Sequence, residues 1–244
     1  ISSGSISSNI WNFGDGNKSS DKNPKYTYSN SGNFNVNLIT TSDKGCIDSS
    51  TKALNIFELP VADFEASDVC DGNSVDFNNK SSIGTGSVNY SWNFGDGFSS
   101  TQTSPSYKYS AYGTYSVELK VTSDKFCTQT TSKNVKVFEV PVAAFNTKDT
   151  CEGDQVSFVN TSSLTSGTMG YKWDFGDGNS SQLTTPFHAY ASNGSFDVKL
   201  RATSNNGCAD SLTQTISIFE KADASFTYSA TCPGEVVSFT STTS

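Results

Sequence analysis

The stretch WNFGDG at residues 11–16 recurs as WNFGDG at 92–97 and as WDFGDG at 173–178. The interval is constant, because 92 − 11 = 81 and 173 − 92 = 81. The six cysteines repeat at the same interval in two series, Cys46/Cys127/Cys208 and Cys70/Cys151/Cys232. Such a period is too long for a helical or leucine-rich solenoid unit and suits a small autonomous domain. The sequence therefore predicts similar domains in tandem.

The register of the repeat divides the 244 residues into four segments, here called copies 1 to 4. Copy 2 (61–141) and copy 3 (142–222) are complete repeats. Copy 1 (1–60) is a partial repeat that lacks the first two strands, and copy 4 (223–244) supplies the first two strands of a further repeat. We interpret the copies as consecutive periods of a longer array. The alternative is that copy 4 completes copy 1 of another molecule by donor-strand exchange.

Apolar and polar residues alternate through several short segments of each copy, and no segment has helical periodicity. In copy 2 this alternation predicts strands in VADFEA (61–66), SVDFNN (74–79), VNYSWNF (88–94), TYSVELKV (114–121) and NVKVF (134–138). Short alternating strands separated by turn signals are typical of an antiparallel sandwich. The fold class predicted is therefore all-β, with tandem Ig-like sandwiches that repeat at the constant interval found for the motif.

The repeated phrase combines a core anchor with a tight turn. Alternate strand residues point to one face, so its tryptophan and phenylalanine should both enter the core. The expected core residues are Trp11, Phe13, Trp92, Phe94, Trp173 and Phe175. Glycines permit positive φ and the aspartate between them can accept backbone hydrogen bonds. The expected turn residues are Gly14, Asp15, Gly16, Gly95, Asp96, Gly97, Gly176, Asp177 and Gly178.

These motifs resemble the PKD (polycystic kidney disease-type) repeats, and the resemblance covers essentially the whole chain. An aromatic pair follows each phrase by about a dozen residues: Tyr26/Tyr28, Tyr107/Tyr109 and His188/Tyr190. A strand then follows, in SGNFNVNL, YGTYSVEL or NGSFDVKL. The resemblance implies an Ig-like spacer or binding module of extracellular proteins. Tyr28, Tyr109 and Tyr190 resemble the tyrosine corner of such sandwiches.

The cysteines suggest disulfides in an oxidising compartment. We place the Cys70 series in the turn between the first two strands and the Cys127 series in the turn before the last strand. Those turns should lie at opposite ends of a sandwich, too far apart for a bond within one copy. Our first hypothesis is an inter-repeat bond, Cys70–Cys208, with Cys46 and Cys151 paired elsewhere or free. The alternative is bonding within a copy, as Cys70–Cys127 and Cys151–Cys208, and Cys232 belongs to the same series as Cys70 and Cys151.

Several kinds of chemistry find little support in the sequence. The net charge of −8 argues against binding to nucleic acid or anionic lipid, and no apolar run is long enough for membrane insertion. His188 is the only histidine, which argues against zinc and against a Ser-His-Asp triad. Asp15, Asp96 and Asp177 are the candidates for calcium, but each copy provides one such carboxylate without a second beside it. We therefore expect no catalytic residues and no cofactor.

The cysteine settings also look like those of PKD repeats in large Bacteroidota surface proteins, which include gliding adhesins and type IX-secreted proteins. DSL (210–212) and DTC (149–151) resemble the O-glycosylation pattern of that phylum, which makes Ser211 and Thr150 candidate sites. The leading hypothesis is a non-catalytic section of an extracellular, cell-surface stalk or filament, whose partners are further repeats. The alternatives are adhesion to glycans, surfaces or proteins through variable loops, and accessory repeats of a secreted hydrolase.

Overall fold

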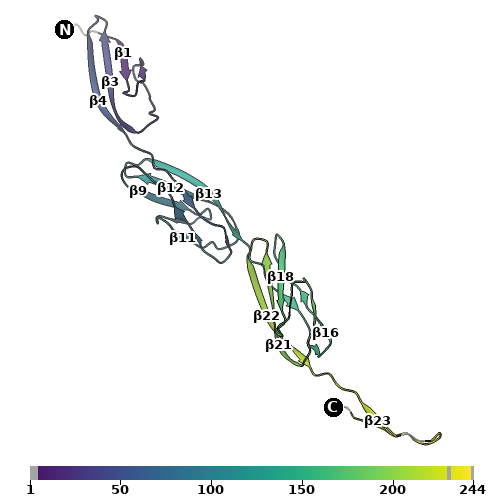
Figure 1. Ribbon diagram of the computed structural model, residues 1–244. Helices are drawn as coiled ribbons and strands as arrows, with labels where there is room; N and C mark the ends of the chain where they lie inside the picture. Colours follow the sequence, from purple (N-terminus) through teal and green to yellow (C-terminus); the bar gives the residue numbers. More distant parts are fainter. Residues whose placement is uncertain (1–4, 230–231, 243–244) are drawn as a thin grey trace. The chain divides into compact units, whose positions relative to one another are not determined.

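All the regular secondary structure is β-strand in the computed structural model, which describes residues 5–229 and 232–242 (Figure 1). Within that part of the chain, no helix has the length and apolar character needed to cross a bilayer. The prediction of an all-β fold built from tandem repeats is confirmed. The exact boundaries of copies 1 to 4 stay a prediction.

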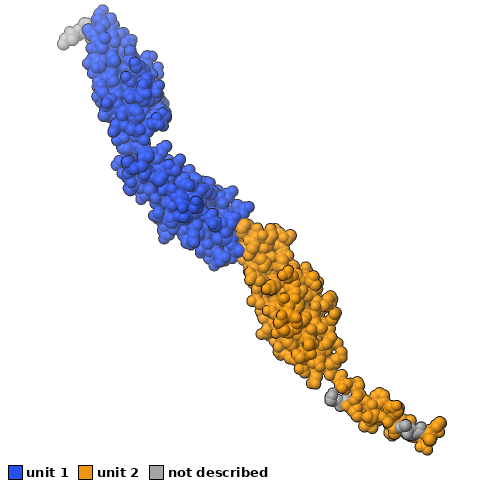
Figure 2. Space-filling model, in the orientation of Figure 1, with its two compact units in different colours: residues 1–110, 114–137 blue, residues 111–113, 138–244 orange. Residues whose placement is uncertain are grey.

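Contacts along the chain divide it into two compact units (Figure 2). The first unit contains residues 1–110 and 114–137, and the second contains residues 111–113 and 138–244. The strands of copies 1 and 2 are β1 (Ile6–Asn12), β2 (Lys18–Ser19), β3 (Gly32–Ser42), β4 (Ile47–Ile56), β5 (Phe64–Glu65), β6 (Val69–Cys70), β7 (Val75–Asp76), β8 (Asn78–Asn79), β9 (Val88–Asn93), β10 (Ser99–Ser100), β11 (Ser106–Tyr107), β12 (Gly113–Ser123) and β13 (Thr128–Phe138).

The strands of copies 3 and 4 follow the same order. They are β14 (Phe145–Asn146), β15 (Thr150–Cys151), β16 (Gln155–Ser157), β17 (Val159–Asn160), β18 (Met169–Asp174), β19 (Ser180–Ser181), β20 (Phe187–Ala189), β21 (Gly194–Ser204), β22 (Ala209–Phe219), β23 (Phe226–Tyr228) and β24 (Phe239–Ser241).

Each complete copy has one five-stranded sheet and two short strand pairs. In copy 2 the sheet order is β10-β9-β12-β13-β6, and the pairs are β5-β8 and β7-β11. In copy 3 the sheet order is β15-β22-β21-β18-β19, and the pairs are β14-β17 and β16-β20. The long strands form antiparallel hairpins, whereas β15 runs parallel to β22 and places Cys151 opposite Phe219.

Side chains from the large sheet and the short pairs meet in one core per complete copy. In copy 2 the fully buried Trp92 packs against Phe64 and Phe77, at ring-centroid distances of 5.1 and 5.6 Å. In copy 3 Trp173 packs against Phe145 and Phe158 at 5.0 and 5.6 Å. The two clusters of buried residues have no member in common. The predicted alternation therefore places both tryptophans at the centre of separate cores.

The expected core position of Trp11 needs a correction, because this side chain is only half-buried. Copy 1 has the four-stranded sheet β2-β1-β3-β4, and the sequence begins after the counterparts of β5 to β8. Those short strands cover the tryptophan in copies 2 and 3. In copy 4, Phe226 is 63% exposed, whereas its counterpart Phe145 is 2% exposed in the complete copy. Burial of these aromatics thus requires both layers of the sandwich.

Two predicted strands of copy 2 are shorter than the alternation suggested. The segment 61–66 contains only β5, with an isolated bridge from Val61 to Ser82, and the segment 74–79 is split into β7 and β8. Cys70 lies in β6, beside β13, and not in the turn where we had placed it. A side chain explains part of this loss: Asp63 N donates to the Ser81 hydroxyl and not to a backbone oxygen, although Asp63 O still accepts a backbone bond from Lys80 N at 2.9 Å.

Candidate functional site: the turn cluster

The repeated Gly-Asp-Gly turn follows the strand that carries the core tryptophan. In copy 2, Gly95 N donates to Asn93 Oδ1 at 3.0 Å, and Phe98 N donates to Asp96 Oδ1 at 3.1 Å. A backbone bond of 3.1 Å from Phe94 N to Phe98 O closes the turn. The aspartate thus satisfies turn N–H groups, as its place between two glycines predicted.

The two glycines of the turn have different roles. Gly95 and Gly97 both have positive φ, at +85° and +97°. A Cβ on Gly95 would lie 2.6 Å from Ser116 O, whereas a Cβ on Gly97 would meet nothing within 4 Å. A Cβ on Gly14 or Gly176 would likewise lie 2.8 Å from a backbone oxygen of the neighbouring strand. The first glycine is therefore required for close approach to the adjacent strand, and the second for its backbone conformation.

A second oxygen of the same aspartate receives a side-chain hydrogen bond from eleven residues downstream. Tyr107 donates from its hydroxyl to Asp96 Oδ2 at 2.8 Å. Its ring stacks on Phe94, with centroids 4.2 Å apart and planes inclined by 7°. Tyr109 donates its hydroxyl to Phe94 O at 3.0 Å, a bond that ties it to the turn and spans more residues than the bond of a tyrosine corner, which joins the tyrosine to the backbone only a few residues upstream. We call Phe94, Asp96, Tyr107 and Tyr109, with their counterparts in copies 1 and 3, the turn cluster.

Copies 1 and 3 build the turn cluster in the same way. In copy 1, Tyr26 donates to Asp15 Oδ2 at 2.6 Å and stacks on Phe13 at 4.0 Å. In copy 3, His188 takes the place of the tyrosine. Its Nε2 lies 2.7 Å from Asp177 Oδ2, and its ring stacks on Phe175 at 4.2 Å. The bonds of the second tyrosine to the turn also recur, from Tyr28 to Phe13 O at 2.9 Å and from Tyr190 to Phe175 O at 2.9 Å.

The hydrogen bonds and burial in the cluster shift its titrating groups. The bond from Tyr26 lowers the pKa of Asp15. Burial opposes ionisation of Asp177, but the bonds from His188 and Asn179 outweigh it and leave the pKa of that carboxyl below its usual value. Burial, with the bond to Asp96, raises the pKa of Tyr107 to about 12. In copy 1 the same hydrogen bond raises the pKa of Tyr26, so that an ionised Asp15 lies beside a protonated phenol.

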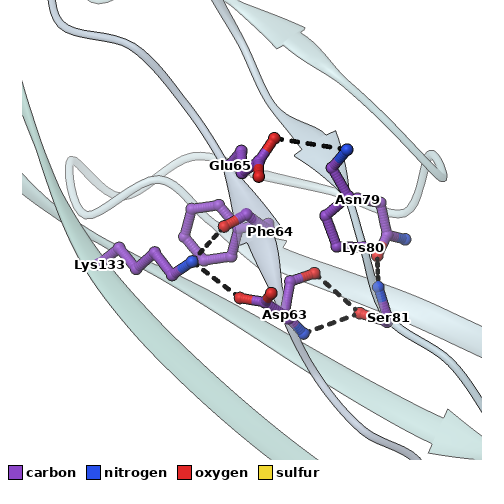
Figure 3. Close-up of polar contacts among 7 residues, drawn as sticks. All are labelled: Asp63, Phe64, Glu65, Asn79, Lys80, Ser81 and Lys133. Carbon is purple, nitrogen blue, oxygen red and sulfur yellow. Dashed lines mark hydrogen bonds and ion pairs between the residues drawn. The ribbon is translucent and has the colours of Figure 1, made fainter.

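A lysine of strand β13 contacts the opening segment of copy 2 at Asp63 and Phe64 (Figure 3). Lys133 lies 2.7 Å from Asp63 Oδ1, donates to Phe64 O, and places its ammonium 5.2 Å from the Phe64 ring centroid. The bond from Lys133 lowers the pKa of Asp63. In copy 3, Gln214 donates to Phe145 O at 3.3 Å from the equivalent position. The contact therefore fixes the opening strand to the large sheet, and a neutral side chain can make the same hydrogen bond to the backbone oxygen.

The proposed calcium candidates use both of their carboxylate oxygens within the protein. Asp15 and Asp177 each accept from a backbone N–H through Oδ1 and from side chains through Oδ2, as Asp96 does. Among the described residues, no group of three or more His, Cys, Asp or Glu side chains is arranged to hold a metal ion. The hydrogen bonds to these aspartates therefore hold the turn against the core.

The cysteines differ in oxidation state. Cys70 and Cys208 are disulfide-bonded. Cys46, Cys127 and Cys151 are free thiols. The alternative of bonds within a copy, Cys70–Cys127 and Cys151–Cys208, is therefore wrong for this structure, since it requires two of the free thiols. The pairing of Cys70 with Cys208 stays a prediction.

The candidate glycosylation sites differ in accessibility. Ser211 is exposed on β22, whereas Thr150 is half-buried in β15, opposite Ile218. Glycosylation of both residues stays a prediction.

Sequence reasoning missed the bond between the turn aspartate and the downstream aromatic. The signal was available, because the spacing is constant: 26 − 15, 107 − 96 and 188 − 177 all equal 11. All three downstream residues are planar rings with a polar atom that can reach a carboxylate. That shared chemistry, more than the identity of the residue, is what the position preserves.

A profile described as "PKD domain" matches residues 2–56, 58–137 and 139–219. The chain is 40% identical over 79 residues to the pre-pro-metalloprotease PrtV of Vibrio cholerae serotype O1, which is 32% of this chain and 8% of that protein. It is 38% identical over 68 residues to a microbial collagenase of Vibrio alginolyticus, which is 27% of this chain and 8% of that protein. The chain thus spans less than a tenth of these relatives.

Two solved structures are similar over a single repeat. The PKD1 domain of Vibrio anguillarum Epp is 41% identical, with 33% of this chain and 94% of that chain covered and a TM-score of 0.31. The PKD1 domain of the Vibrio cholerae metalloprotease PrtV is also 41% identical, with 33% and 98% covered and a TM-score of 0.30.

Proposed function

This chain belongs to the PKD domain family, and on that premise we propose that it is a non-catalytic structural section of a long extracellular stalk or filament. Its role would be to space or present an adhesive tip on a bacterial surface. The observation that carries the proposal is that the most constant part of the repeat, the turn cluster, is used entirely to hold the turn on the core. Disulfide-bonded Cys70 and Cys208 fit an oxidising, extracellular setting.

The dimensions of a copy suit a spacer. Strand β12 has 11 residues, which at ~3.3 Å per residue gives about 36 Å. Copies 2 and 3 have the same length although their loops 98–106 and 179–187 differ at five of nine positions. Selection for the length that each copy adds to a stalk would keep the length of the repeat constant and allow its surface residues to vary.

The spacer proposal is tested on the whole chain in solution. Small-angle scattering should give a maximum dimension above about 100 Å, as three copies of about 36 Å arranged in series require. Incubation with peptide, ester and glycoside substrates should give no turnover. A compact particle in scattering would overturn the proposal of reach, and turnover by the purified chain would overturn the non-catalytic role.

Adhesion through variable loops is the second candidate. Three large apolar side chains lie exposed in these loops: Phe98 at 64%, Leu183 at 67% and Phe187 at 65%. Their counterparts in the other copy are polar, namely Asn179, Gln102 and Ser106. Glycan-array binding that is lost in F98S or F187S would favour adhesion. An array without hits, for a chain that scatters as an extended particle, would favour the spacer.

Accessory repeats of a secreted hydrolase are the third candidate. The similarity to PrtV and to a microbial collagenase supports it, since those names denote proteases that contain similar repeats. Genomic sequence on either side of the region that encodes this chain would decide: an adjacent protease domain would favour the accessory role.

A further inference from the structure

A short strand pair of copy 3 has an apolar outer face. Strand β16 pairs with β20, and Ser157 lies opposite Phe187. Val156 and Phe158 are buried in the core, so Ser157 and Phe187 point to the solvent side. Val159 points the same way as Ser157 and lies diagonal to Phe187, within reach of an aromatic side chain. Phe187 is 65% exposed and Val159 is 48% exposed, so the two form an apolar patch open to solvent.

The fold does not require these apolar side chains. Their counterparts in copy 2 are Ser106 and Asn78, since 187 − 81 = 106 and 159 − 81 = 78. Strands β7 and β11 nevertheless form the same pair in copy 2, with Ser106 opposite Asp76. Phe187 thus takes part in a strand pair that also forms with serine in its place. Its exposed ring is therefore available to a ligand.

A hollow of about 430 Å³ lies beside the patch. Known small-molecule sites have volumes of ~300–1,000 Å³. One wall is formed by Gln155, Ser157 and Val159, and the other by residues 146–150. All of these residues belong to copy 3, so the hollow lies within one complete sandwich.

The path of the chain explains the hollow. Asn146 pairs with Val159, as the last residue of β14. The chain then leaves the small layer and joins the large sheet at Thr150, where β15 runs beside β22. The segment between these two points separates from β16, and the space between them is the hollow. An apolar patch that borders a cavity is typical of a binding site.

The charges around the hollow favour a neutral ligand. Its only charged lining residues are Lys148 and Asp149, which have opposite signs. Asp149 Oδ1 already accepts a hydrogen bond of 2.9 Å from Ser217 N of the large sheet. In copy 2 the counterparts of the lining residues include three carboxylates and no cationic side chain: Glu65, Asp68 and Asp76. Copy 3 therefore has lost the negative charge of this face and gained an aromatic ring beside it.

The lining groups match the chemistry of a sugar. The amides of Asn146 and Gln155 and the hydroxyl of Ser157 can each donate and accept hydrogen bonds, as sugar hydroxyls do. The C–H face of a pyranose ring is apolar and can pack on an exposed aromatic ring such as that of Phe187. An ionic ligand would have to give up its hydration without gaining an unpaired opposite charge. A neutral glycan meets both requirements.

We infer that the outer face of β16, β17 and β20 in copy 3 is a binding site for a neutral glycan. The Phe187 ring is the platform on which a sugar ring packs, and Gln155 and Ser157 provide hydrogen bonds from the hollow beside it. This inference rests on the adhesion candidate of the previous subsection and narrows it to one copy and one class of ligand. The role of the chain as a spacer does not depend on it.

The experiment measures binding of the whole chain to immobilised polymers by surface plasmon resonance. Three of the polymers are neutral polysaccharides, namely a β-glucan, a galactomannan and a dextran. Polygalacturonate is the anionic polysaccharide and gelatin is the polypeptide. We expect saturable binding to at least one neutral polysaccharide and none to polygalacturonate or gelatin.

Two variants locate the site. F187S introduces the residue that copy 2 has at this position, and should raise the dissociation constant for the neutral polysaccharide by about tenfold or more. F98N is the matched control, because Phe98 is a similarly exposed phenylalanine of copy 2 and asparagine is its counterpart in copy 3. It should bind like the unsubstituted chain. Equal melting temperatures of the variants would show that neither substitution acts by unfolding.

The outcomes separate this inference from the other proposals. Absence of binding to all three neutral polysaccharides, or equal affinity of F187S and the unsubstituted chain, would overturn it. Binding that F98N removes and F187S retains would support adhesion by copy 2 and overturn the site in copy 3. Binding to polygalacturonate or gelatin that F187S removes would overturn the assignment to a neutral glycan. None of these results changes the scattering test of the spacer.

Discussion

His188 Nε2 lies 2.7 Å from Asp177 Oδ2, in the place where the other copies put a tyrosine hydroxyl. The histidine keeps the stack on the preceding phenylalanine, with planes inclined by 7° in copies 2 and 3 alike. Two different side chains therefore satisfy the same carboxylate oxygen from the same stacked position, which makes this pair a sensitive probe of the turn cluster.

Substitution at His188 should separate the hydrogen bond from the stack. H188F keeps a ring on Phe175 but leaves Asp177 Oδ2 without this donor, and should cost copy 3 about 1–2 kcal/mol. H188Y restores the arrangement of copy 2 and should stay within about 0.5 kcal/mol of the unsubstituted protein. Hydrogen exchange of the β21 amides reports on copy 3 directly. Equal exchange in H188F and H188Y would show that the bond contributes nothing.

The lowered pKa of Asp177 should make copy 3 sensitive to acid. A carboxyl whose pKa is lower in the folded state than its unfolded value of about 3.8 contributes stability that is complete above that value. The contribution is lost as the pH falls through the lower, folded value. Urea unfolding at pH 5 and pH 3 should show this loss, and D177N should show less of it. An identical acid loss in D177N would contradict the assignment.

Tyr107 should have the opposite dependence at high pH. Burial and the bond to Asp96 raise its pKa from 10.0 to about 12 in the folded protein. Its contribution to stability is therefore complete below pH 10 and lost as the pH rises through about 12. Absorbance at 295 nm should show a phenol that ionises near pH 12 and is missing in Y107F. Ionisation of every tyrosine near pH 10 in the folded chain would refute this.

The two glycines of one turn should respond differently to alanine. G95A places a methyl group 2.6 Å from Ser116 O at a φ of +85°, so β12 must move and copy 2 should lose more than about 3 kcal/mol. G97A meets no atom within 4 Å and carries only the conformational cost, about 1–2 kcal/mol. Calorimetry measures both. Equal losses would mean that close approach to Ser116 is unimportant.

Phe126 is the one described non-glycine residue with positive φ, at 63°, where the other hairpins have Gly45 and Gly207. Its side chain is 87% exposed and contributes little packing. F126G should remove a left-handed conformation that costs a non-glycine residue about 1–2 kcal/mol. Part of this gain in stability should be offset, because glycine is more flexible in the unfolded chain. We expect thermal stability to rise, with F126A as the control that keeps the strain. A fall in F126G would mean that Phe126 makes a contact of its own.

Period and alternation were sufficient to predict the parts of the fold that depend on burial. Trp92, Phe94, Trp173 and Phe175 are core residues because strand geometry puts alternate side chains on one face. The short opening strands were overestimated, in part because the Ser81 hydroxyl accepts from Asp63 N, a backbone group that a ladder would otherwise use. Alternation carries no information about such competition from side chains.

The sequence predicted the turn residues of the turn cluster but not their downstream partner. Local signals identify the glycines and the aspartate, since their roles concern the turn itself. The partner eleven residues away depends on how β11 or β20 returns to the turn, which no local pattern records. The position of Cys70 beside β13 could not be predicted from a local pattern either, because the two-residue strand β6 is too short to show periodicity.

Both buried tryptophans donate their indole N–H to a main-chain oxygen ten residues downstream, Gln102 O in copy 2 and Leu183 O in copy 3, each at 2.9 Å. Every amino acid has that oxygen, so the loop is fastened without reference to the side chain it displays. Polar Gln102 and apolar Leu183 accordingly occupy equivalent positions in the two loops and accept the same hydrogen bond. The side chain at this loop position can therefore change without loss of the hydrogen bond that holds the loop to the core.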